Sequence, residues 1–106
     1  PPLRDEDYLI LSTIHSAKGL EWDAVFIIWV AEGRFPSAYS QEREEDLEEE
    51  RRLMYVAATR ARHYLYLLYP SVSYTRYLGT TVNLVSRFLR DLPSTLLETL
   101  QVQPDW

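Results

Sequence analysis

The chain has 106 residues and a mass of 12.5 kDa, so it holds one domain at most, with a modest core. Hydrophobic residues make up 46% and charged residues 25%, which excludes a disordered or fibrous chain, and the net charge of −5 argues against a free-standing nucleic-acid binder. The lack of cysteine excludes disulfides and thiolate metal sites and fits a cytoplasmic protein, and the longest apolar run, residues 24–31, is too short to span a membrane.

Two apolar runs of strand length come first in the chain, residues 8–14 and residues 24–30. Their β-branched and aromatic side chains are typical of strands buried on both faces of a parallel sheet. Only nine residues separate the runs, fewer than a parallel crossover usually needs, so we expect one tight helical turn between them. Gly33, Pro36 and two serines then predict a loop over residues 31–41.

A helix is predicted over residues 46–62. Its apolar and small side chains recur at the spacing of one helix face, at Leu47, Met54, Ala57, Ala58 and Ala61. Acids gather at its start and arginines toward its end, as the helix dipole favours. Residues 64–69 then predict a third strand, which Pro70 closes.

The C-terminal part is predicted to be mainly helical. Asn83 is a candidate N-cap for a short helix over residues 84–91, and a last helical turn is expected within residues 94–100. Residues 71–80 are polar and irregular, and no element is assigned to them. This order predicts an α/β layered domain, a small and mostly parallel sheet flanked by helices. Because three strands leave sheet edges open, we expect the chain to be part of a larger protein.

The segment between the first two strands, residues 13–23, is rich in groups that bind phosphate. It contains two hydroxyls, an imidazole, an ammonium group, a glycine and carboxylates. Hydroxyl, imidazole and ammonium groups suit phosphate oxygens, which position a nucleic-acid strand without reading its sequence. A solvated turn needs none of these groups. The segment therefore indicates contact with a nucleotide or a nucleic acid.

Three segments resemble signature sequences of the UvrD/Rep-like superfamily 1 DNA helicases. Ile14-His-Ser-Ala-Lys-Gly-Leu-Glu-Trp-Asp23, with residues 25–26 and 32–36 after it, resembles the fifth helicase motif and the segment that follows. Residues 48–61 resemble the sixth motif, and residues 86–93 resemble a later stretch found in many members. The resemblance covers residues 8–93. It implies that residues 1–106 are a partial second RecA-like domain, of the P-loop NTPase type but without the P-loop itself.

The resemblance gives Arg60 the role of the catalytic arginine finger, which reaches the γ-phosphate of ATP. A guanidinium stays charged and offers forked donors to phosphate oxygens, and losing such a finger typically lowers turnover on the order of 10³-fold. The alternative is a helix-surface arginine paired with an acid. Arg62 lies about 200° further around a helix, so it is interpreted as structural or as a backbone contact. Tyr55 and Thr59 are candidates for bracing Arg60, although a packed tyrosine is the simpler interpretation.

Other residues are matched to the nucleotide and to DNA. Glu21 matches a carboxylate near the nucleotide sugar, where it would accept hydrogen bonds from ribose hydroxyls; a solvated acid is the alternative. Gly19 would allow close backbone approach or a positive φ, or would simply end a helical turn. The side chains matched to the single-stranded DNA face are Thr13, His15, Ser16 and Lys18. His15 also fits a hydrogen-bonded core histidine.

The chain contains neither a phosphate loop nor a separate acidic, magnesium-binding strand. ATP with Mg²⁺ is therefore expected to bind mainly to the first RecA-like domain of the parent chain, and the isolated fragment is predicted to be inactive. That domain and single-stranded DNA are the expected partners. The acidic run over residues 42–50 is interpreted as a solvated helix start rather than a metal site. Trp22 and the Ala57-Ala58 pair depart mildly from the usual motifs without removing a charge.

The resulting prediction is a C-terminal motor-domain fragment of an ATP-dependent DNA helicase, which couples ATP hydrolysis to translocation on single-stranded DNA and to unwinding. Two alternatives stay open. One is a non-motor interaction module or a degenerate paralogue with the same fold, although the presence of Arg60 and Lys18 argues against decay. The other is the helicase part of a helicase-nuclease.

Overall fold

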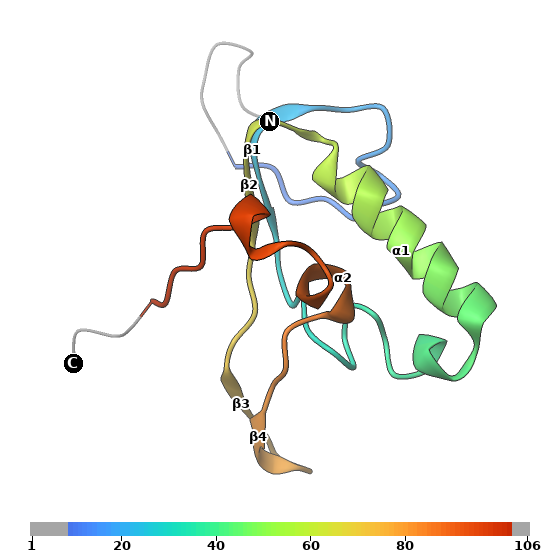
Figure 1. Ribbon diagram of the computed structural model, residues 1–106, viewed down its shortest axis with the longest axis vertical. Coiled ribbons are helices and arrows are strands. Elements are labelled where there is room, and N and C mark those ends of the chain that lie inside the picture. The colour runs from blue at the N-terminus through green and yellow to red at the C-terminus, as the bar shows by residue number, and fades with distance from the viewer. Residues whose placement is uncertain (1–8, 103–106) are drawn as a thin grey trace.

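The computed structural model describes residues 9–102 (Figure 1). In chain order its elements are β1 (Trp22–Ile27), the 3-10 turn η1 (Ser40–Glu42), α1 (Glu44–Ala58), β2 (Ala61–Leu67), β3 (Val72–Thr75), β4 (Gly79–Val82), α2 (Arg87–Arg90) and the 3-10 turn η2 (Ser94–Leu96). The strands form two separate two-stranded sheets, β1–β2 and β3–β4. The described part is thus a small mixed α/β domain. No helix within residues 9–102 is long and apolar enough to cross a membrane.

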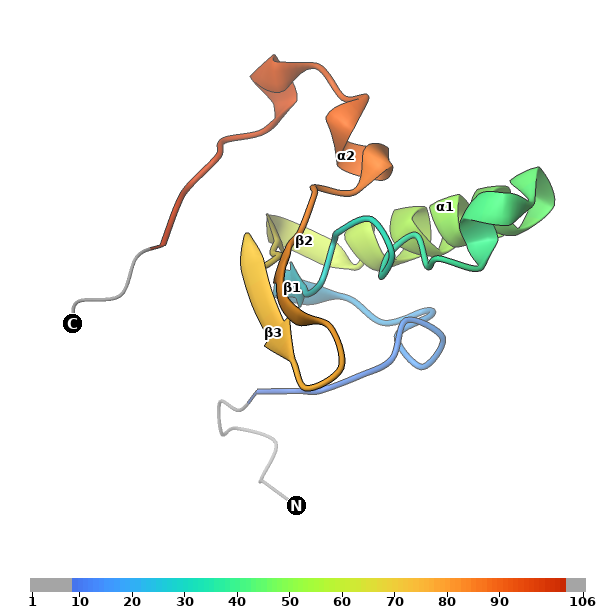
Figure 2. The ribbon, with the colours of Figure 1, turned by 90° about the horizontal axis from the view of Figure 1, so that it is seen from below.

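Strands β1 and β2 run parallel, as the sequence predicts, and α1 connects them. Phe26 lies opposite Tyr66 in the register, and a bulge between Trp22 and Ala24 shifts the start of the pairing. Helix α1 lies to one side of this pair in both views (Figure 1 and Figure 2). The β1–β2 pair and α1 together form the framework that carries both helicase-like motifs.

Helix α1 begins two residues before the predicted helix and ends four residues before its predicted end. Glu44, Glu45 and Asp46 occupy its first turn, where the helix dipole favours acids. The early end follows from strand pairing. Trp22 N–H donates to the Arg60 carbonyl at 2.9 Å, and β2 already starts at Ala61. Residues 59–60 therefore form a turn, and residues 61–62 belong to β2.

The hydrophobic core lies between β1, α1 and α2. Its buried members are Ile27, Val30, Met54, Ala57 and Phe88. The ring of Phe35 meets Phe88 edge-on, with centroids 5.8 Å apart, and so attaches the segment after β1 to α2. This core holds one face of the β1–β2 pair against α1.

The opposite face of the β1–β2 pair is exposed. Phe26 and Tyr66 stack on it with ring centroids 4.5 Å apart, and Phe26 keeps 57% of its surface accessible. Both strands also have an unpaired edge within the described residues. This agrees with the expectation that the sheet requires cover from other protein.

The prediction of a strand over residues 8–14 is wrong for the part of it that the structure describes. Tyr8 lies outside the described residues, and residues 9–14 form no strand. Leu11 is 88% exposed. A strand needs a neighbour for its backbone hydrogen bonds, and this run has none within residues 9–102. The parallel sheet is therefore two-stranded here, not three-stranded.

The hairpin β3–β4 was not assigned from the sequence. Its strands are antiparallel, with Val72 opposite Val82 and Thr75 opposite Gly79, and it extends away from α1 (Figure 1). The Thr75 hydroxyl accepts a hydrogen bond from Leu78 N–H at 3.0 Å, and Gly79 has a φ of 69°. Gly79 therefore supplies the left-handed conformation that closes the turn.

Helix α2 is shorter than the predicted helix over residues 84–91, and Ser86 rather than Asn83 is its N-cap. The Ser86 hydroxyl accepts from Phe88 N–H at 3.2 Å. Asn83 instead donates its side-chain amide to the Pro70 carbonyl at 2.9 Å and so fixes the base of the hairpin. The predicted last turn within residues 94–100 is present as η2.

Candidate functional site

Residues 13–19 form the single tight turn that the sequence predicts between the first two apolar runs. The Thr13 hydroxyl accepts from Ser16 N–H at 3.1 Å, and the Thr13 carbonyl accepts from Ala17 N–H at 3.0 Å. This is the arrangement of an N-cap on a short helical turn. Ala17 is buried, and Ile14 packs against the core. The turn is thus anchored by its apolar residues.

The polar side chains of this turn face solvent. All four predicted DNA-facing residues are exposed, namely Thr13, His15, Ser16 and Lys18. The exposure of His15 contradicts its alternative interpretation as a core histidine. Within residues 9–102, neither His15 nor Lys18 has a carboxylate within 4.0 Å. The turn therefore presents an ammonium group, an imidazole and hydroxyls on one anchored loop.

Gly19 ends this turn with a φ of 83°. A Cβ built at Gly19 would meet no atom within 4 Å, so space does not require glycine here. The left-handed backbone does, because a side chain strains that conformation. The geometry fits a glycine that ends a helical turn.

Arg60 lies just after α1, on the two-residue connection to β2. Its Nε donates to the Val56 carbonyl at 3.1 Å, and its Nη2 donates to the Thr59 hydroxyl at 3.2 Å. No carboxylate lies within 4.0 Å of its guanidinium among the described residues. Within residues 9–102, Arg60 therefore differs from the alternative interpretation, in which it is a surface arginine paired with an acid. By contrast, the arginines with a carboxylate within that distance are Arg43, Arg51, Arg52, Arg62, Arg87 and Arg90.

Glu21 is an exposed residue directly before β1, and Arg62 is its main contact. Arg62 Nη2 donates to the Glu21 carbonyl at 3.2 Å, while Arg62 Nε lies 3.9 Å from the Glu21 carboxylate. The same guanidinium lies 3.8 Å from Asp23, which is also 4.0 Å from His63. Arg62 is therefore a structural and backbone contact, as expected, and it holds the entrance of β1 to β2.

Strand pairing brings the two helicase-like motifs together. The hydrogen bond from Trp22 N–H to the Arg60 carbonyl joins the residue after Glu21 to the residue proposed as the finger. Glu21 and Arg60 therefore lie at the same end of the β1–β2 pair although 38 residues of chain separate them. A second contact between the two strand starts is the hydrogen bond from Arg62 Nη2, in β2, to the Glu21 carbonyl, directly before β1. One cation and one carboxylate of the predicted nucleotide site are thus neighbours.

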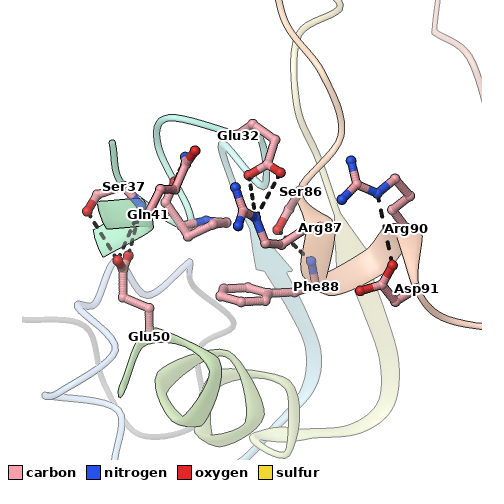
Figure 3. Close-up of polar contacts among 10 residues, drawn as sticks. Glu32, Ser37, Gln41, Glu50, Ser86, Arg87, Phe88, Arg90 and Asp91 are labelled. Atoms are coloured by element: carbon pink, nitrogen blue, oxygen red, sulfur yellow. Dashed lines mark hydrogen bonds and ion pairs between the residues drawn. The ribbon is translucent and has the colours of Figure 1, made fainter. Parts of the chain in front are cut away.

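Sequence reasoning missed a second polar network, shown in Figure 3. Arg87 Nε donates to both carboxylate oxygens of Glu32, at 3.0 and 3.3 Å, across 55 residues of chain (Figure 3). On α1, the Glu50 carboxylate accepts from Ser37 N–H at 3.1 Å and from the Ser37 hydroxyl at 3.1 Å (Figure 3). These contacts tie residues 32–37 to α2 and α1. No local pattern in the sequence identifies such distant pairs.

Residues 3–72, well over half of the chain, match the family described as the UvrD-like helicase C-terminal domain. The matched range contains the turn at residues 13–19, Glu21 and Arg60. The chain belongs to this UvrD-like family. Helix α2 and strand β4 lie beyond the matched range.

Curated relatives extend the similarity of this UvrD-like chain further along its length. It is 44% identical over 95 residues to the ATP-dependent DNA helicase PcrA of Bacillus subtilis, covering 90% of this chain and 13% of that protein. It is 43% identical over 99 residues to DNA helicase II of Escherichia coli, covering 92% of this chain and 14% of that protein. PcrA of Staphylococcus aureus is 42% identical over 95 residues, with 88% and 13% covered. The chain thus spans about one seventh of each relative.

The acidic run of this UvrD-like domain does not converge on a metal site. Within residues 9–102, no group of three or more histidine, aspartate or glutamate side chains is placed to hold a metal ion. Two of the acids instead pair with arginines one turn further along α1, Glu48 with Arg51 and Glu49 with Arg52. These contacts match the prediction of a solvated helix start.

Proposed function

We propose that this chain is the C-terminal motor-domain part of an ATP-dependent DNA helicase. In this proposal residues 1–106 form a partial second RecA-like domain, with its motif-bearing core at residues 8–93. It completes a nucleotide site whose other half is the first RecA-like domain of the parent chain. Membership of the UvrD-like family and similarity to PcrA and DNA helicase II support the assignment.

The environment of Arg60 gives this proposal its main support. It is a cation without a carboxylate partner in the described residues, it is held on main-chain and hydroxyl oxygens, and it lies at the same end of the sheet as Glu21. A phosphate is a stronger partner for a guanidinium than a neutral carbonyl, because both groups are charged and the guanidinium fork matches two oxygens. Arg60 is therefore suited to stabilise the charge on the transferred γ-phosphoryl group.

Glu21 has a complementary role in this proposal. Its carboxylate is exposed and lies 3.9 Å from the Arg62 guanidinium, longer than a hydrogen bond. Its oxygens are thus open to accept hydrogen bonds from the hydroxyls of a nucleotide sugar. Gly19, two residues earlier, ends the turn so that Glu21 enters β1 beside Arg60. Arg60, Glu21 and Gly19 together form this domain's share of the nucleotide site.

The described residues do not fit a Mg²⁺ site, since no cluster of acidic ligands converges among them. In this proposal ATP with Mg²⁺ binds mainly to the first RecA-like domain, where the ion neutralises charge on the phosphates. Because the sequence contains neither a phosphate loop nor a separate acidic, magnesium-binding strand, we expect the isolated chain to lack ATPase activity.

Residues 13–18 form the contact with single-stranded DNA in this proposal. The exposed side chains of Thr13, His15, Ser16 and Lys18 provide donors for backbone phosphates, which bind a strand without sequence preference. Only a few residues separate this turn from Glu21. When this domain moves to close over ATP, the DNA-contacting turn therefore moves with it. Translocation and unwinding follow from repeated closing and opening.

The test is the DNA-stimulated ATPase activity of the parent helicase carrying Arg60→Ala. We expect turnover to fall on the order of 10³-fold. Arg43→Ala is the matched control, because Arg43 is an exposed arginine whose only described ion pair is with Glu45 at 3.5 Å. Normal turnover of Arg60→Ala would refute the proposal, as would an equal loss in the Arg43 control.

A further inference from the structure

The hydroxyl of Thr59 lies between the last carbonyls of α1 and the Arg60 side chain. Thr59 Oγ1 is 2.9 Å from the Tyr55 carbonyl and 3.0 Å from the Val56 carbonyl, and it accepts from Arg60 Nη2 at 3.2 Å. A hydroxyl has one hydrogen and two lone pairs, so it donates to one carbonyl and still accepts from the guanidinium. Thr59 thus connects the helix end to Arg60 with a polarised chain of hydrogen bonds.

The guanidinium has a second attachment on the same helix turn. Arg60 Nε donates to the Val56 carbonyl at 3.1 Å, so two of its three nitrogens are bound. The last four carbonyls of a helix lack an amide partner within the helix, and the C-terminal end of a helix attracts a cation. Within residues 9–102, Arg60 Nη1 has no hydrogen-bond partner. The two attachments therefore fix the plane of the guanidinium and leave one nitrogen open.

We infer that Thr59 is a positioning residue, whose hydroxyl holds Arg60 in the orientation from which it meets the nucleotide. This inference rests on the proposed function of Arg60. Without the hydroxyl, Nε alone would hold the group, and the guanidinium would rotate about its remaining contact. Tyr55 does not share this role, because the residue is 71% exposed and its described hydrogen bond to Thr59 uses its carbonyl rather than its side chain. Thr59 itself is exposed, so replacing its hydroxyl leaves the core intact.

The experiment uses the parent helicase with Thr59→Val, which replaces the hydroxyl by a methyl group, and Thr59→Ser, which keeps the hydroxyl. Single-turnover ATP hydrolysis on saturating single-stranded DNA and the KM for ATP are measured for each. Thr59→Val is expected to lower the hydrolysis rate about tenfold with KM changed less than about twofold, since misoriented groups mainly affect the reacting state. Thr59→Ser is expected to stay within about twofold of the original rate.

Two further variants separate positioning from a general structural effect. Thr59→Ala removes the hydroxyl without adding a methyl group, and it must show the same loss as Thr59→Val even if the valine variant folds poorly. In an Arg60→Ala background, Thr59→Val is expected to cause no further loss, because the group it orients is gone. Full activity of both hydroxyl-free variants, or a tenfold loss in the Arg60→Ala background, would overturn the inference.

The same set of variants keeps this inference apart from the proposed function. If Arg60→Ala hydrolyses ATP normally, the role of Arg60 is wrong and the positioning role fails with it. If Arg60→Ala is inactive while both hydroxyl-free variants at position 59 are fully active, only the positioning role is wrong.

Discussion

Breaking the ion pair between Glu32 and Arg87 is expected to loosen α2 from the rest of the domain. The pair joins the segment after β1 to the first residue of α2, and it lies beside a backbone hydrogen bond from Glu32 N–H to the Leu84 carbonyl at 3.0 Å. Arg87→Met is the chosen change, because methionine keeps much of the apolar stem while removing the charge. It leaves the Glu32 carboxylate without its cation.

The magnitude follows from the burial of the pair. The Arg87 and Glu32 side chains are 27% and 17% exposed. Removing one partner of a fully buried pair typically costs about 3–5 kcal/mol, whereas exposed pairs contribute about 0–1 kcal/mol. The partial burial here places the expected cost at about 2 kcal/mol. That is about a 30-fold change in a local opening equilibrium.

Amide hydrogen exchange in the parent protein measures this local opening. The reporters are Leu89 and Arg90, whose N–H groups donate to the Ser86 carbonyl at 3.0 and 3.1 Å. Their protection is expected to fall about 30-fold in Arg87→Met. The double variant Glu32→Leu/Arg87→Met is expected to recover part of the loss, since it leaves no unpaired charge.

The matched control is the shorter but exposed pair between Arg52 and Glu49. Its nitrogen and oxygen are 2.7 Å apart, yet both side chains are more than half exposed. Arg52→Met is expected to leave the protection of α1 and α2 unchanged, because water replaces the lost partner. If Arg87→Met leaves the α2 amides as protected as in the unaltered protein, or if Arg52→Met lowers their protection as strongly, burial does not set the strength of these ion pairs.

Two other changes test separate parts of the account. Ser86→Ala removes the N-cap of α2 at a fully buried position, so we expect the stability of α2 to fall by about 1 kcal/mol. The loss is measured as faster hydrogen exchange of the Phe88 amide, and unchanged exchange would contradict the capping role. Lys18→Ala in the parent helicase is expected to weaken single-stranded DNA binding equally for different sequences and to lower the salt slope of log affinity by about 0.7, as for one lost phosphate contact. A salt slope equal to that of the unaltered protein would show that Lys18 does not bind phosphate.

The sequence predicts the central framework because its signals there are local. The periodic apolar face of α1 and the run beginning at Ala24 predict a helix packed on a strand, and β1 and β2 are parallel as expected. The boundaries differ where pairing overrides local preference. Thr59 and Arg60 leave the helix because the Arg60 carbonyl accepts from Trp22 N–H and β2 begins at once. The sequence around Arg60 does not indicate that Trp22 is its hydrogen-bond partner.

The wrong strand prediction for residues 9–14 and the unassigned β3–β4 hairpin both have their origin in tertiary context. Residues 9–14 have the composition of a buried strand, but composition does not supply a neighbouring strand to pair with. The β3–β4 hairpin has short strands with polar threonines and a three-residue turn through Arg76, Tyr77 and Leu78 rather than an Asn-Gly pair, so its signal is weak.

In the candidate site, the sequence identifies the functional residues but not the contacts that they make. The motifs select Arg60, Glu21 and the turn at residues 13–18 because the chemistry of these side chains is visible in the sequence. Their partners are not visible. The hold of Arg62 on Glu21 spans 41 residues and that of Arg87 on Glu32 spans 55. Such contacts depend on how the elements pack, so only the structure reveals which arginines are paired and that Arg60 has no acid within 4.0 Å among residues 9–102.

In the proposed function, Arg60 acts on the reacting phosphate rather than on nucleotide binding or folding. The most direct measurement compares two quantities in the parent helicase with and without Arg60→Ala: the affinity for ATP and the single-turnover rate of its hydrolysis on single-stranded DNA. We predict a rate lower on the order of 10³-fold with an affinity changed less than about tenfold. An unchanged hydrolysis rate, or a loss confined to ATP affinity, would contradict the account.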